Sequence, residues 1–176
     1  HLILEMNDTT QEQAGKAMIA ALIAIFIILL LDFRRLLPAL LATLPLLFSI
    51  SFTLALLWLL EEKHNYVNMI AWPIIIGIGV DDGVHFLHRL RQEGRRGIVK
   101  TTRSVGHAML ITTLTTMIGF GSLLLFSMEG MKSLGLVLTV GVAFCFIVTV
   151  TLLPALATLL ERWILKDKKK DTQAQE

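Results

Sequence analysis

Five long windows without a single charged residue dominate this chain. They cover residues 17–31, 36–60, 64–80, 104–128 and 133–160, and all 30 charged residues lie in the other 66 positions. A soluble helix needs a polar face, and a disordered chain needs low hydrophobicity. The windows therefore exclude both a water-soluble domain and a disordered chain, and they predict a protein that crosses a membrane several times.

The fold class that these windows predict is an all-α integral membrane protein, a five-transmembrane-helix bundle. About 20 apolar residues cross a bilayer as a helix, and we expect the spans at 16–31, 36–60, 66–87, 104–128 and 133–160. The third span reaches full length only if it continues through Asp81 and Asp82. The alternating pattern of β-barrel strands is absent. We expect residues 16–165 to form the transmembrane bundle and 166–176 to be a polar tail.

The basic residues predict how the spans are oriented. If five spans alternate, 13 of the 16 lysines and arginines fall on one side of the membrane, and only Lys16, Lys63 and Lys132 fall on the other. Loops rich in lysine and arginine stay in the cytoplasm. We therefore expect the N-terminus outside the cell and the C-terminal tail in the cytoplasm. We also expect residues 89–103 to form a basic amphipathic segment on the inner membrane surface.

Several functional classes find no support in the composition. The net charge of +2 is too small to indicate a nucleic-acid partner, and the single Cys145 forms neither a disulfide framework nor a metal cluster. His85 and His88 have a spacing seen in metal sites, but further ligands are missing. The polar segments are too short to build an aqueous domain. We expect no enzyme activity, no metal and no cofactor.

Two adjacent carboxylates interrupt the third window, in the stretch from Pro73 to Arg89. An aspartate at the centre of a membrane helix costs about 2.5–3.5 kcal/mol and usually marks an ion or proton path. Loss of water and a like charge nearby both favour the neutral form, so Asp81 and Asp82 could share one proton as a coupled unit. Alternatively, both lie at the cytoplasmic end of the helix and are simply solvated.

The neighbours of the carboxylates suit a packed helix with a polar face. Gly77, Gly79 and Gly83 allow another helix backbone to approach closely. His85 follows Asp81 by four residues and Asp82 by three, so all three share one helix face. His85 therefore either passes protons toward the cytoplasm or is an interfacial residue without such a role.

The fourth window contains a row of hydroxyl-bearing and small residues, here called the seam, that would complement the carboxylates. The residues of the seam are Thr112, Thr113, Thr115, Thr116 and Gly119. Hydroxyl groups and glycines at helical spacing either hydrogen-bond the carboxylates or a chain of water molecules, or serve ordinary small-residue helix packing. In the second case each hydroxyl donates back to its own helix. The two interpretations are compatible with each other.

These motifs together resemble the resistance–nodulation–division (RND) superfamily, in its MMPL-like branch with a sterol-sensing-domain type of bundle. The resemblance rests on Gly-Ile-Gly-Val-Asp-Asp-Gly-Val-His (77–85), Thr-Thr-Leu-Thr-Thr (112–116) and Leu-Leu-Pro-Ala-Leu (152–156), and it covers residues 10–165. It implies spans 8–12 of a twelve-span protein whose N-terminal half and periplasmic porter domains are missing here, with residues 1–15 as the end of a periplasmic domain. It also implies a bacterial cytoplasmic (inner) membrane protein with a periplasmic N-terminus and a cytoplasmic C-terminus. It also implies Asp81 as the proton-carrying residue, with Asp82 less firmly matched.

The function implied by this resemblance is proton-driven export of hydrophobic or lipid-like molecules, including efflux by proton antiport, with the proton gradient as the energy source. The bilayer, the missing parts of the same protein and a second copy of the chain are the expected partners. One alternative is an RND-like accessory subunit of the Sec translocon, which aids protein secretion. Another is a sterol-sensing-type membrane sensor that transports nothing. An intramembrane protease is disfavoured, because its two aspartates lie on different helices.

Overall fold

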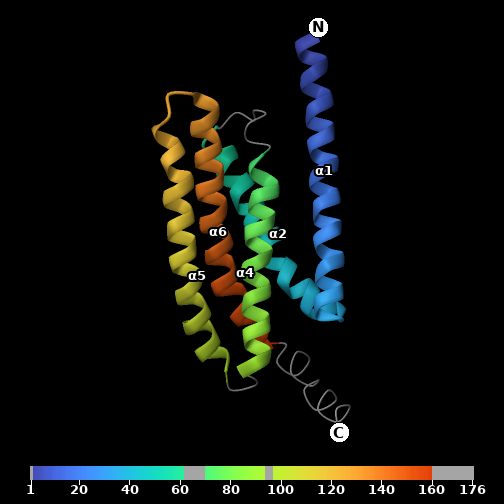
Figure 1. The fold of residues 1–176 in the computed structure, drawn as a ribbon, viewed down its shortest axis with the longest axis vertical. Helices are drawn as coiled ribbons and strands as arrows, with labels where there is room; N and C mark the ends of the chain where they lie inside the picture. The colour runs from blue at the N-terminus through green and yellow to red at the C-terminus, as the bar shows by residue number, and fades with distance from the viewer. Residues whose placement is uncertain (1, 62–69, 94–96, 160–176) are drawn as a thin grey trace.

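The computed structural model describes residues 2–61, 70–93 and 97–159, with side chains from residue 15 onward except at position 17. These ranges form five long α-helices and one short 3-10 helix, and they contain no strand. The helices are α1 (Leu2–Phe33), α2 (Leu36–Leu59), α4 (Ala71–Glu93), α5 (Ile98–Gly121) and α6 (Glu129–Leu159), and η1 (Ser122–Leu125) follows α5 (Figure 1). The predicted all-α bundle of five helices is confirmed.

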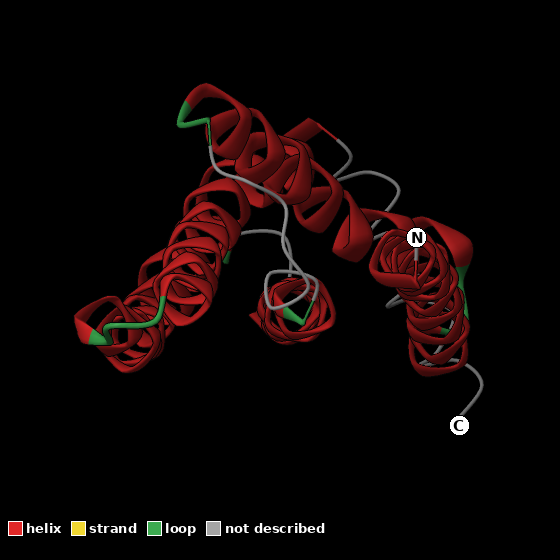
Figure 2. Cartoon of the chain, turned by 90° about the horizontal axis from the view of Figure 1, so that it is seen from above, coloured by secondary structure: helices red, strands yellow, loops and turns green. Residues whose placement is uncertain are grey.

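Helix α4 is central to the arrangement. It contacts α1, α2, α5 and α6. Seen from above, α5, α6, α2 and α1 form a curved layer, and α4 stands on the concave side of that layer (Figure 2). The helix that carries the paired aspartates is therefore the one that most of the bundle surrounds.

Two clusters of apolar side chains hold the bundle together. The larger one joins α1, α2, α4 and α6 and includes Leu46, Phe86 and Leu153, each of which is at most 1% exposed. The smaller one joins α2, α4 and α6 around Ile75 and Val137. Many other apolar side chains remain exposed, such as Leu31, Trp58 and Ile118. Large exposed apolar surfaces of this kind suit helices that face lipid.

Three of the helices are long and apolar enough to cross a membrane, namely α2, α6 and the continuous run of α5 with η1. The apolar part of α1, Met18–Phe33, is shorter. In α4 the apolar stretch is followed by Asp81, Asp82 and several cations. The crossing of the membrane by α1 and α4, and the limits of every span, therefore stay predictions.

Most of residues 89–103, expected to form a basic amphipathic segment on the inner membrane surface, lie within two long helices, and their place at that surface stays a prediction. Helix α4 continues to Glu93 and α5 begins at Ile98, so most of these residues extend the two helices. Buried Leu90 and the ion pair between Arg89 and Glu93, four residues apart, support the last turns of α4. Residues 94–96, the whole of the expected tail at 166–176, and residues 66–69 of the expected third span lie outside the described residues.

Candidate functional site

A pocket of about 560 Å³ lies between α4 and α5, and Val142 of α6 closes one side. Asp81, Asp82 and His85 reach it from α4, and Thr112, Thr113 and Thr116 reach it from α5. On each helix these positions recur every three to four residues, which is the spacing of one helix face. The structure thus brings the two predicted polar motifs together in one cavity.

The two carboxylates have different environments. The side chain of Asp81 is 71% exposed, and its Oδ1 lies 3.3 Å from Nε2 of His85 on the next turn. Asp82 is only partly exposed. Because they are consecutive, the two side chains leave α4 about 100° apart. One carboxylate therefore faces outward from α4 beside His85, and the other is more enclosed by the bundle.

The hydroxyl groups of the seam donate hydrogen bonds to their own helix. Thr112 donates to the carbonyl oxygen of Met109 at 2.9 Å, and Thr116 donates to that of Thr112 at 2.8 Å. This is the back-bonding expected for ordinary helix packing. It leaves the oxygen lone pairs of both hydroxyls available as acceptors toward the pocket. They suit a water molecule or a protonated carboxyl better than a charged carboxylate.

The other two threonine positions differ from each other. Thr113 lines the pocket and is 6% exposed. Thr115 is exposed, bonds back to the carbonyl of Thr112 at 2.8 Å, and is not among the residues that line the pocket. Thr115, which the sequence grouped with Thr112 and Thr116 in the seam, is therefore not a pocket residue in this structure. Its position on α5 turns it away from α4.

The glycines of α4 and α5 differ in how closely other helices approach them. A Cβ atom on Gly83 would lie 2.7 Å from the carbonyl oxygen of Ala42 in α2, and one on Gly79 would lie 2.8 Å from Sγ of Cys145 in α6. Both glycines therefore allow the close helix packing that was predicted. No described atom would lie within 4 Å of a Cβ added to Gly77 of α4 or to Gly119 of α5, so these two glycines do not lie at close helix contacts.

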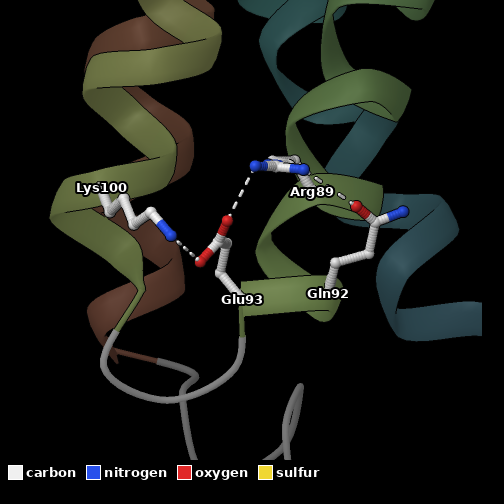
Figure 3. A network of polar contacts seen from close by, with 4 residues as sticks. All are labelled: Arg89, Gln92, Glu93 and Lys100. Carbon is white, nitrogen blue, oxygen red and sulfur yellow. Dashed lines mark hydrogen bonds and ion pairs between the residues drawn. The ribbon is translucent and has the colours of Figure 1, made fainter.

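Arg89 also lines the pocket, although the sequence analysis used it only as one of the basic residues that orient the spans. Arg89 follows His85 by four residues, and this spacing indicates that both side chains lie on the same face of α4. Its guanidinium donates to Glu93 Oε1 at 2.8 Å and to Gln92 Oε1 at 3.3 Å, and Lys100 of α5 donates to Glu93 Oε2 at 2.8 Å (Figure 3). The hydrogen bond from Lys100 lowers the pKa of the Glu93 carboxyl, and the charges of Lys100 and Arg89 add to this.

The described residues contain no group of three or more histidine, cysteine, aspartate or glutamate side chains that could hold a metal ion. His85 and His88 instead contact separate aspartates. His85 lies beside Asp81 on α4, and His88 Nε2 lies 2.6 Å from Oδ2 of Asp32 on α1. The pocket thus combines two carboxylates and an imidazole, which are groups able to take up and release protons, with hydroxyl groups that can hydrogen-bond to them.

Comparison with known proteins agrees with the motifs that meet in this pocket. The sequence profile of the MMPL family matches residues 2–175. The chain belongs to the MMPL family. It is 34% identical over 177 residues to a protein of Methanocaldococcus jannaschii that is described only as a membrane protein, and that match covers 96% of this chain and 46% of the relative.

Two further relatives are named hopanoid transporter HpnN. The one from Rhodopseudomonas palustris is 32% identical over 133 residues, which is 76% of this chain and 15% of the relative. The one from Burkholderia multivorans is 34% identical over 154 residues, which is 88% of this chain and 17% of the relative. The chain spans less than half the length of each of these three relatives.

Proposed function

We propose that this chain is part of a proton-motive-force-driven exporter of hydrophobic or lipid-like molecules, in which Asp81 and Asp82 relay protons. The observation that carries the proposal is the pocket that joins both carboxylates with His85 and the threonine seam. Ionisable groups inside a membrane bundle usually mark such a path. The hopanoid transporters among the relatives support the substrate class.

The relay follows from the groups around the pocket. With both carboxylates charged, their mutual repulsion favours uptake of one shared proton. The acceptor lone pairs of Thr112 and Thr116 then stabilise the protonated carboxyl or the water beside it. Moving one charge through the membrane potential supplies about 2.3 kcal/mol per 100 mV, which is enough to bias two conformations that differ by a few kcal/mol.

The proposal includes partners and a location. Asp81 and His85 are each 71% exposed, and a charged side chain facing lipid is costly. We propose that the remainder of the same protein, including its porter domains, covers this face. A homo-oligomer is compatible with this arrangement. The protein lies in the cytoplasmic membrane with the N-terminal end of this chain outside and its C-terminal end inside.

The test uses the full-length protein in proteoliposomes with an imposed pH gradient and a pentacyclic hopanoid as the transported probe. We expect Asp81→Asn and Asp82→Asn to abolish gradient-driven transport. Infrared difference spectra between acidic and neutral pH should also lose the band of a protonated carboxyl. Glu93→Gln is the matched control, because it neutralises an acid on the same helix outside the pocket and should retain both signals. Unchanged spectra and transport in both aspartate variants would refute the relay.

The transport experiment, together with an assay of protein secretion, separates the alternative functions. A sterol-sensing-type sensor would bind the hopanoid without moving it when a gradient is applied. A Sec accessory subunit would instead show gradient-dependent stimulation of protein secretion that the aspartate variants lose. Proton binding at the pocket without hopanoid transport, but with that stimulation, would favour the Sec role.

A further inference from the structure

A cluster at the ends of α1 and α4 has no part in the pocket. It consists of Asp32 and Phe33 of α1 and His88 and Arg91 of α4, which we call the α1–α4 clasp. His88 Nε2 lies 2.6 Å from Asp32 Oδ2. The His88 ring also stacks on Phe33, with centroids 4.9 Å apart and planes inclined by 19°. The guanidinium carbon of Arg91 lies 5.0 Å from the centroid of the same Phe33 ring.

The clasp combines three kinds of contact on one pair of helices. Phe33 is 3% exposed, and it is enclosed as part of the larger apolar cluster. The hydrogen bond, the ring stack and the cation over the ring each constrain the orientation of α4 relative to the end of α1. A displacement of this end of α4 is therefore difficult without a displacement of α1.

The clasp is also close to the carboxylates along the helix. His88 follows Asp81 by seven residues, nearly two helical turns, which is roughly 10 Å along the axis. A helix transmits a tilt or rotation over that distance as a rigid rod. A change at the pocket thus reaches the clasp directly through the backbone of α4.

We propose that Asp32 and His88 are positioning residues that pass a protonation-driven displacement of α4 to α1. This proposal rests on the proposed proton relay. On that basis α1 moves with α4 when the carboxylate pair changes its protonation state. The movement of α1 carries the change toward the outer side of the membrane, where α1 begins.

The contact between Glu93 and Lys100 provides a matched comparison. It lies at the same end of α4 and also joins charged side chains, but it links α4 to α5 (Figure 3). These two helices are consecutive and are separated by only a few residues. Breaking this pair leaves the covalent connection in place, so it should not uncouple α1 from α4.

Pulsed electron paramagnetic resonance on spin-labelled full-length protein tests the proposal. Two proteins are each labelled at a pair of exposed positions, Ile27 (α1) with Ile147 (α6) in one and Ile70 (before α4) with Ile147 in the other, so that each reports one distance to α6. Buried Cys145 is replaced by serine in both. Protonation is imitated at constant pH by the double variant Asp81→Asn with Asp82→Asn. With an intact clasp, both distances in this double variant should differ from those in the parent protein.

Clasp variants then separate the two movements. His88→Phe keeps a ring against Phe33 but removes the nitrogen that contacts Asp32, so the shift of α1 should be reduced while that of α4 remains. Asp32→Ala should give the same result, His88→Lys should restore the α1 shift through an ion pair, and Glu93→Gln should keep both shifts.

An α1 shift of undiminished size in His88→Phe and Asp32→Ala, or one that His88→Lys fails to restore, would overturn the clasp while leaving the proton relay intact. Absence of both shifts with an intact clasp would overturn the protonation-driven displacement itself, and the clasp proposal with it.

Discussion

Single residues determine how closely α4 packs against its neighbours. At Gly83 the backbone of α2 comes so near that an added Cβ would lie 2.7 Å from the carbonyl oxygen of Ala42. A backbone atom cannot move aside as a flexible side chain can. Gly77, on the same helix, has no described atom within 4 Å of the corresponding position. The two glycines therefore form a natural pair for mutation.

We expect Gly83→Ala to lower the free energy of unfolding by about 1–3 kcal/mol, the usual cost of overpacking. Gly77→Ala should be neutral or should raise it by up to about 1 kcal/mol, because alanine favours helix. Thermal unfolding of the purified full-length protein in detergent measures both. Equal effects of the two substitutions would contradict the close approach of α2 and α4.

Buried hydroxyl groups give a second contrast. Thr149 of α6 is fully buried, and its hydroxyl has no hydrogen-bond partner among the described residues. Thr53 of α2 is equally buried, but its hydroxyl donates to the carbonyl of Ser49 at 2.8 Å. An unpaired buried polar group costs about 1–3 kcal/mol.

Thr149→Val should therefore leave the free energy of unfolding unchanged or raise it, whereas Thr53→Val should lower it by about 1 kcal/mol, the net value of a typical hydrogen bond. Both substitutions keep the side-chain shape. The unfolding experiment described for the glycines applies, and greater destabilisation by Thr149→Val than by Thr53→Val would contradict the assignment.

At the residue level, the sequence predicted the pocket acids and most of the seam, because an aspartate in an apolar helix and hydroxyls at helical spacing are both visible as patterns. It could not separate Gly83 from Gly77, since that distinction depends on where α2 approaches α4. It also missed Asp32 with His88. Those residues are 56 positions apart, and their contact exists only in the folded bundle.

Among the elements, the α4–α5 hairpin depends on charged contacts at its connection. Glu93 accepts from Arg89 of its own helix and from Lys100 of α5. These contacts lower the pKa of the Glu93 carboxyl. A carboxyl with a lowered pKa in the folded state stabilises that state above the ordinary glutamate range, and its contribution is lost as the pH falls through the lowered pKa.

We therefore expect the first turn of α5 to open more readily as the pH falls. Hydrogen exchange at the amide of Thr101, which donates to the carbonyl of Gly97 at 2.7 Å, reports this opening. In Glu93→Gln, exchange at neutral pH should already match that of the acidified parent, after correction for intrinsic rates. Identical protection in parent and variant across the whole range would contradict the role of Glu93.

The sequence located the helices better than it located their ends. Charged residues suggested that the fourth span begins at 104, yet α5 begins at Ile98. Side-chain ion pairs and buried residues such as Thr101 keep a polar segment helical beyond the apolar window. Hydropathy indicates where a helix meets the bilayer, whereas packing and capping determine where it stops.

For the whole molecule, the arrangement of helices agrees with the alternation predicted from charge. The turn after α1, the end of α4 and the start of α5 lie together at one end of the bundle, and the connection of α5 to α6 lies at the other (Figure 1). Arg34, Arg89 and Lys100 are at the first end, and Lys132 is near the second.

We expect Lys100→Cys in the full-length protein to react with a membrane-impermeant maleimide only from the cytoplasmic side, and Lys132→Cys only from the outer side. Intact cells and inverted vesicles supply the two conditions, and the parent protein with its buried Cys145 supplies the background. Labelling of both positions from the same side would contradict the five-span orientation.

Helix α5 has few buried positions, although it forms one wall of the pocket. Only Thr101, Gly106, Met109 and Thr113 are buried along it, and neither apolar cluster includes any of these four residues among its buried members. Other α5 side chains, Ile98, Val105 and Phe120, pack against the two clusters only as partly buried residues. The end of this wall lies close to α6, because a Cβ added to Gly135 would lie only 2.9 Å from the carbonyl oxygen of Phe120. A displacement of α5 that changes the shape of the pocket therefore has to displace this part of α6 as well.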